Sequence, residues 1–99
     1  MNILREAEDL IRNVIQQAVL KTEWIEKISD VPPIVLEKPN NEQHGDYATN
    51  IAMQLTKMAK QPPRKIAQAI VDHIDVSGTY IRKVDIAGPG FINIFMDYD

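Results

Sequence analysis

Phe91 and Asn93 are the two residues of this chain whose types and spacing best suit a binding role. They stand two positions apart in a run of strand-forming residues, so their side chains share one side of a predicted strand. An aromatic ring can stack on an unpaired RNA base, and a carboxamide can hydrogen-bond the edge of that base. The pair predicts a site for an exposed base, although the same spacing suits equally well a face that the first helix or another domain covers.

Basic side chains gather at one point of the sequence. Lys57, Lys60, Arg64 and Lys65 lie around the junction of two predicted helices. Such a cluster is commonly no more than a solvated face, and its more specific interpretation is a patch that contacts RNA phosphates.

Groups that perform catalysis are scarce. The chain has no cysteine, which excludes disulfides, a thiolate metal site and a cysteine nucleophile. Its histidines, His44 and His73, lack the convergent partners that a three-ligand metal site needs. A small hydrolase built around His44 and Asp46 ranks third among the hypotheses, because no nucleophile accompanies them.

Length and charge limit the class of protein. A chain of 99 residues fits one domain. A net charge of −3 argues against a freestanding nucleic-acid binder, which usually presents a basic face. No apolar run approaches the roughly 18 residues of a membrane helix. We therefore expect a soluble, cytoplasmic protein without membrane partners.

The first half of the chain predicts a helix, a short strand and a loop. Apolar residues recur at helical spacing from Asn2, the expected N-cap, to about Leu20. After Pro32 and Pro33 stop any helix, residues 34–36 are β-branched or apolar and predict a strand. Residues 38–45 are polar and predict an exposed loop.

The second half predicts two helices and a β-hairpin. One helix is expected to begin at Asp46, as its cap, and to run to Ala59. Another begins at Pro63, a residue well suited to a first helical turn. Residues 80–87 and 91–96 then form strands around a tight turn of Gly88, Pro89 and Gly90. The predicted class is α+β, with a small antiparallel sheet and its C-terminal hairpin packed on about three helices.

Three stretches in this order resemble one known family. They are residues 44–50 (HGDYATN), 63–67 (PRKIA) and 87–93 (AGPGFIN). Together they are similar to the N-terminal additional domain of bacterial-type arginyl-tRNA synthetases, and the likeness covers essentially the whole chain. The resemblance implies that residues 1–99 are one tRNA-docking domain at the front of a longer, multidomain synthetase.

The resemblance also implies roles for particular residues. Phe91 and Asn93 match the aromatic and amide positions that handle an exposed D-loop nucleotide at the tRNA elbow. The basic cluster described above, independently of the resemblance, makes Lys57, Lys60 and Arg64 the candidate phosphate contacts. The remaining motif residues are expected to be structural: Gly45, Asp46, Tyr47, Gly88, Pro89 and Gly90.

The resemblance assigns the chemistry to the rest of the parent protein. The ATP-binding signatures of such synthetases are absent from this chain, so it should hold no catalytic residue, cofactor or metal of its own. The parent is expected to join arginine to its tRNA with ATP and Mg. The alternative is a protein-interaction or folding module of a larger cytoplasmic protein.

Overall fold

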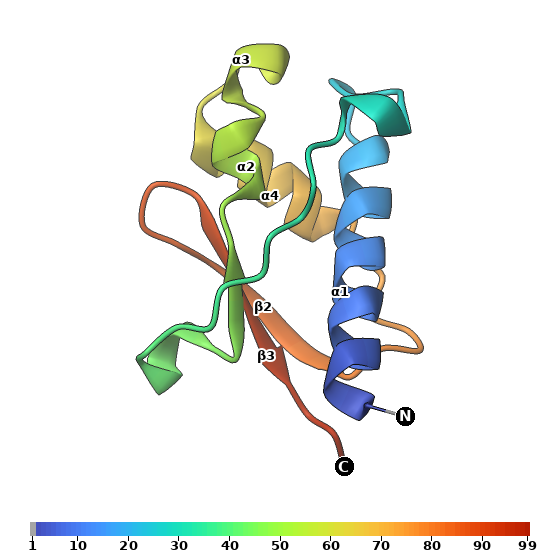
Figure 1. The fold of residues 1–99 in the computed structure, drawn as a ribbon. Helices are drawn as coiled ribbons and strands as arrows, with labels where there is room; N and C mark the ends of the chain where they lie inside the picture. Colours follow the sequence, from blue (N-terminus) through green and yellow to red (C-terminus); the bar gives the residue numbers. More distant parts are fainter. Residues whose placement is uncertain (1) are drawn as a thin grey trace.

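The computed structural model describes residues 2–99, which form the predicted α+β fold. The three strands make one antiparallel sheet in the order β1-β3-β2, with β3 at its centre (Figure 1). The elements are α1 Ile3–Leu20, η1 Ile28–Asp30, η2 Glu42–His44, β1 Tyr47–Thr49, α2 Ile51–Gln54, α3 Thr56–Ala59, α4 Pro63–Asp72, β2 Ile81–Ala87 and β3 Phe91–Met96.

Helix α1 begins where its capping residue predicts. The Asn2 side chain accepts hydrogen bonds from the backbone N–H groups of Leu4 and Arg5, at 3.0 and 3.3 Å, which satisfies two donors that the first turn leaves free. The buried stripe of the helix is Ala7, Ile11, Ile15, Ala18 and Val19. The apolar residues of its first turn are not part of this stripe, because Ile3 and Leu4 remain exposed.

Helix α4 and the hairpin are confirmed. Pro63 occupies the first turn of α4, where its missing N–H would have no helical partner. The two hairpin strands pair from Ile81↔Met96 to Ala87↔Phe91. The helix ends at Asp72, so Ile74 lies beyond it and is only half-buried.

One hydrophobic core lies between the helices and one face of the sheet. Ile92 and Ile94 of β3 are fully buried in it with residues of α1, α2 and α4. Because side chains alternate along a strand, Phe91 and Asn93 lie on the opposite face of the sheet. The functional candidates therefore stand away from the helical layer.

The predicted helix from Asp46 to Ala59 is wrong in its first part. Residues 47–49 form strand β1, which pairs antiparallel with β3 at Tyr47↔Ile94. The helical part is split into α2 and α3, and it begins after Thr49, whose hydroxyl accepts a hydrogen bond from the Ile51 N–H at 3.2 Å. Pairing with β3 outweighs the local helical spacing, because Tyr and Thr suit a pleated, buried position.

The predicted strand at residues 34–36 is also wrong. This segment forms only an isolated bridge, in which Glu37 and Ala48 exchange two backbone hydrogen bonds of 2.8 Å. Toward residues 34–36 the next hydrogen-bonded pair would join Val35 to Asn50, but Asn50 is already the N-cap of α2. In the other direction the pair would need an N–H from Pro39, which has none. The segment is thus a coil pinned at one point to β1.

None of the helices within residues 2–99 has both the length and the apolar character needed to span a membrane.

Candidate nucleic-acid interface

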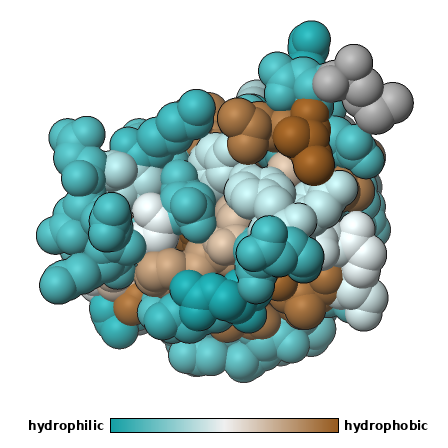
Figure 2. All heavy atoms as spheres, turned by 90° about the horizontal axis from the view of Figure 1, so that it is seen from below, coloured by the Kyte–Doolittle hydropathy of each residue, from teal (hydrophilic) through white to brown (hydrophobic). Residues whose placement is uncertain are grey.

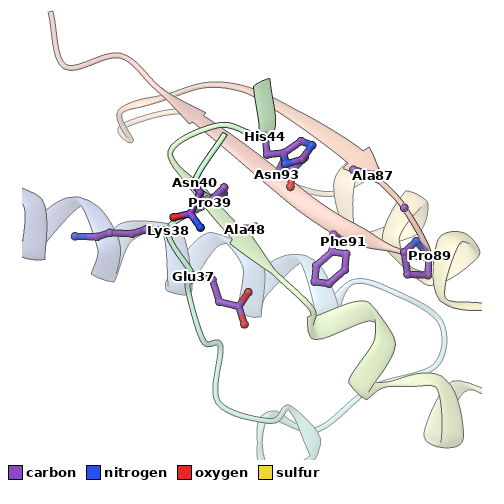
Figure 3. Close-up of a pocket in the computed structure, with 11 residues that line it drawn as sticks. Glu37, Lys38, Pro39, Asn40, His44, Ala48, Ala87, Pro89, Phe91 and Asn93 are labelled. Atoms are coloured by element: carbon purple, nitrogen blue, oxygen red, sulfur yellow. The ribbon is translucent and has the colours of Figure 1, made fainter. Parts of the chain in front are cut away.

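A hollow of about 480 Å³ opens on the sheet face that carries Phe91 and Asn93. Its floor is formed by β1 and β3, and its walls come from the pinned coil, the end of η2 and the hairpin turn. Figure 3 shows both side chains projecting from β3 toward the coil segment of Glu37 and Asn40. The lining residues are Glu37, Lys38, Pro39, Asn40, His44, Ala48, Ala87, Gly88, Pro89, Phe91 and Asn93.

Asn93 lies deeper than the sequence indicates. It is only 5% exposed, since it sits on the central strand between Ala48 and Asp85. No hydrogen bond joins its carboxamide to any other residue in the described part of the chain. Among the described residues no fully buried polar side-chain atom lacks a hydrogen-bond partner, so the Asn93 amide still reaches the hollow, where its donors and acceptor are available to a ligand.

The two aromatic residues of β3 differ in access. Phe91 is half-buried at the rim, beside the hairpin turn. By strand alternation Phe95 lies on the same side of β3, but Lys83 Nζ lies 4.4 Å and Arg82 Cζ 5.6 Å from its ring centroid, and the residue is buried. Of the two rings, Phe91 is therefore the one that can stack on an incoming base.

The 44–46 segment holds β3 in place, and Asp46 is not the helix cap that we predicted. Its carboxylate accepts a hydrogen bond of 2.7 Å from the Met96 N–H, and its own N–H donates one of 2.9 Å to the Ile94 carbonyl. Gly45 has a φ of +86°, and a Cβ there would lie 2.7 Å from that carbonyl oxygen. These contacts anchor the strand immediately after Asn93.

Tyr47 ties the same strand pair to helix α1. Its hydroxyl donates a hydrogen bond of 2.9 Å to a Glu8 carboxylate oxygen. Burial, together with this bond and the nearby Tyr98, raises the pKa of Tyr47 above its usual value. The phenol stays a neutral donor, so it joins the two layers from the helical side of the sheet.

The hairpin turn packs on the start of α4. A Cβ on Gly90, at φ +136°, would lie 2.9 Å from the Pro63 Cβ, so only glycine fits this close approach. The Arg64 guanidinium donates a hydrogen bond to the Gly88 carbonyl. The three motifs of the sequence therefore meet around β3: residues 44–46 near one end, and the turn with the α4 start at the other.

Comparison with known proteins identifies this arrangement. The family model described as the arginyl tRNA synthetase N terminal domain matches residues 6–96. The chain belongs to this family.

Curated relatives agree with that assignment. An arginine–tRNA ligase of Bacillus subtilis is 50% identical over 97 residues, and one of Anoxybacillus flavithermus is 45% identical over 97. In both cases the match covers 98% of this chain and 17% of the relative. The chain thus spans about a sixth of these proteins.

Solved structures share the fold at low identity. The arginyl-tRNA synthetase of Plasmodium falciparum superimposes with a TM-score of 0.69 at 18% identity, over 92% of this chain and 16% of that one. The arginyl-tRNA synthetase of Thermus thermophilus superimposes with a TM-score of 0.67 at 20% identity, over 89% of this chain and 13% of that one. The α+β arrangement is therefore shared with parts of these two solved structures.

The basic cluster of this synthetase domain is exposed beside the turn. Lys57 lies on α3, Lys60 ends that helix at a left-handed φ of +55°, and Arg64 and Lys65 open α4. None of the four forms a salt bridge with another residue between positions 2 and 99. Only Arg64 reaches a residue that lines the hollow, through its bond to Gly88.

The geometry around His44 and Asp46 bears on the hydrolase hypothesis. His44 lines the hollow, whereas the Asp46 carboxylate is engaged by the backbone of β3. The described residues contain no group of three histidine, cysteine or acidic side chains placed to hold a metal ion. The hydrolase hypothesis gains no support from this geometry.

Burial of Phe91 and Asn93 against the chain's own helices would have favoured the alternative of a protein-interaction or folding module. Both side chains instead face the hollow on the other side of the sheet. Sequence reasoning missed the coil wall of Glu37 to Asn40. Its position depends on the single bridge to Ala48, for which the sequence carries no local signal.

Proposed function

We propose that this domain docks the synthetase on tRNA and that its hollow receives an unstacked base of the D-loop at the tRNA elbow. The observation that carries the proposal is the Asn93 carboxamide, which is 5% exposed, has no partner among the described residues and lies beside the Phe91 ring. A base edge offers complementary donors and acceptors, and its flat face stacks on an aromatic ring.

The dimensions of the hollow support a base-sized guest. Its volume of about 480 Å³ lies within the range of roughly 300 to 1,000 Å³ of small-molecule sites. The walls of Glu37 and His44 offer further polar contacts to a nucleoside. Phe91 stands at the rim, where a flipped base can lie on its ring while its edge points down to Asn93.

The exposed basic residues suit the backbone of the same RNA. Lys57 and Lys60 carry charges without ion pairs within the described chain, and Arg64 stands next to the turn that borders the hollow. Phosphate contacts of this kind orient an RNA without reading its sequence. Because the domain has a net charge of −3, its affinity alone should be weak, with most attraction coming from the rest of the protein.

The parent activity is part of the same proposal. Relatives named arginine–tRNA ligase are 45% and 50% identical to this chain. We infer that the whole protein attaches arginine to its tRNA in the cytoplasm with ATP and Mg, and that this domain supplies binding without catalytic residues.

A binding measurement with the full-length protein tests the proposal. Asn93→Ala should weaken affinity for arginine-accepting tRNA, whereas Asn13→Ala should not, because that amide is exposed on α1 away from the hollow. Equal affinities of the two variants would remove the assigned role from Asn93.

A further inference from the structure

The first turn of α1 exposes apolar side chains that its amphipathic pattern predicts to be buried. Ile3 is 49% and Leu4 46% exposed, whereas Ala7, Ile11 and Ile15 of the same helix are fully buried. The helix therefore extends its apolar stripe beyond the domain's own core. Ile3 and Leu4 are adjacent, and contiguous apolar patches, unlike scattered single residues, mark surfaces that another structure covers.

The C-terminal tail lies at the same end of the molecule (Figure 1). The Asp97 N–H donates a hydrogen bond of 2.8 Å to the Tyr80 carbonyl, and the rings of Tyr80 and Tyr98 are 5.4 Å apart between centroids. Tyr98 also lies near Tyr47, which is hydrogen-bonded to Glu8 of α1. The tail is thus held against the body of the domain up to Tyr98.

Tyr98 and the first turn of α1 border the same region. Glu8 is one helical turn after Leu4, so the two residues are neighbours on the surface of α1. Tyr98 retains 40% exposure despite its contacts. Figure 2, which looks at the molecule from below, shows brown, apolar areas among the hydrophilic residues of this face. We call Ile3, Leu4 and Tyr98 the terminal apolar surface.

We propose that the terminal apolar surface is the docking site for the polypeptide that follows this domain in the full-length synthetase. This inference rests on the proposed function only in assuming such a parent. The matched relatives extend far beyond this domain, which fills 17% of their length, and the family is that of an N-terminal domain. In such a parent the following region is tethered beside Tyr98, one residue from the last position of this domain.

The chemistry favours that occupant over RNA. The surface consists of two aliphatic side chains and a phenol, while the basic cluster lies on α3 and α4. A tether raises the effective concentration of the following region, so a small apolar contact is enough to hold it. Docking here would fix the orientation of the base-binding hollow relative to the rest of the synthetase.

Thiol labelling of the full-length protein tests this proposal. The 99 residues contain no native cysteine, so Leu4→Cys and Val76→Cys each place one thiol in the domain, at sites that are 46% and 42% exposed here. Mass spectrometry of the modified peptides gives the maleimide reaction rate at each site without tRNA present. We expect the thiol of Leu4→Cys to react about tenfold more slowly than that of Val76→Cys. This ratio corresponds to a docked state of the domain that is about tenfold more populated than the undocked state. In urea, where the chain is unfolded, the two thiols should react at equal rates. Equal rates in the native protein as well would overturn the proposal.

A second pair of variants guards against an effect of the thiol itself. Leu4→Asp should make this domain unfold at a lower temperature in the full-length protein, whereas Val76→Asp should not. Equal effects would count against the proposal, and so would protection at position 4 that rises with protein concentration, because that outcome assigns the surface to a second copy. Neither measurement involves tRNA, so failure here leaves the base-binding proposal standing.

Discussion

The Asp46 carboxylate accepts a hydrogen bond of 2.7 Å from the backbone N–H of Met96, fifty residues further along the chain. Together with the bond from the Asp46 N–H to the Ile94 carbonyl, it closes the end of β3 next to Asn93. The histidine–glycine–aspartate stretch therefore acts as a clamp on the strand that bears the candidate binding residues.

Removal of the clamp carboxylate should destabilise the domain. Asp46→Ala leaves the Met96 N–H without its charged partner, and we expect a loss of about 1.5 to 3 kcal/mol in the free energy of unfolding. Asp97→Ala is a matched control, since that carboxylate accepts a backbone N–H from Asp99 at the exposed tail. Urea denaturation of both variants measures the difference, and an equal loss in the control would contradict the clamp.

Gly45 should be far less replaceable than Gly78. Both have positive φ, at +86° and +75°, but a Cβ on Gly45 meets the Ile94 carbonyl oxygen at 2.7 Å, while one on Gly78 meets nothing within 4 Å. Gly78→Ala should cost roughly 1 kcal/mol from backbone strain alone. Gly45→Ala should cost clearly more, because it must also displace β3. Thermal unfolding of the two variants decides between these outcomes, and similar losses would show that the close approach is unimportant.

The Tyr47 phenol should make stability fall at high pH. The folded state raises the pKa of Tyr47 above its usual 10.0, through burial and the bond to Glu8. The stabilisation that the Tyr47 phenol contributes is complete below its unfolded-state pKa. It is lost progressively as the pH rises from the unfolded-state pKa through the folded-state pKa, because the unfolded chain releases the proton at lower pH than the folded chain. The free energy of unfolding of the unsubstituted protein should therefore fall by up to about 1.4 kcal/mol per pH unit more than that of Tyr47→Phe. Denaturant titrations from about pH 8 to about pH 11 test this, and parallel curves would refute it.

Charge removal at the helix junction should change the salt dependence of tRNA binding. If Lys57 contacts a phosphate, Lys57→Gln in the full-length protein lowers the slope of log affinity against log salt by about 0.7 to 0.9. Lys27→Gln removes an equal charge from an exposed loop and should leave the slope unchanged. Identical slopes for both variants would place Lys57 outside the interface.

Local signals predicted the elements whose causes are local. Asn2 caps α1 and Pro63 opens α4, and each acts through groups within its own first turn. The period-2 pattern likewise placed Phe91 and Asn93 on one side of β3 and the isoleucines on the other.

Long-range pairing explains what the sequence did not predict. Tyr47 belongs to a strand because β3, more than forty positions later, pairs with it, as the register Tyr47↔Ile94 records. The low exposure of Asn93 follows from its place on the central strand, together with the coil that the Glu37–Ala48 bridge holds beside it. Neither contact produces a periodic pattern of residues in the sequence, so the hollow could not be predicted. The shared face of Phe91 and Asn93 could be predicted, because it follows from the alternation of side chains along one strand.

The most direct test of base binding is a double-mutant cycle between Asn93 and the D-loop. Full-length protein and its Asn93→Ala variant are titrated with arginine-accepting tRNA, either intact or abasic at one D-loop nucleotide at a time. We predict that each change alone weakens binding by about 1 to 3 kcal/mol at one nucleotide, and that the second change then adds little. Additive losses at every D-loop position would contradict the account, because Asn93 and a base that it holds must share one interaction energy.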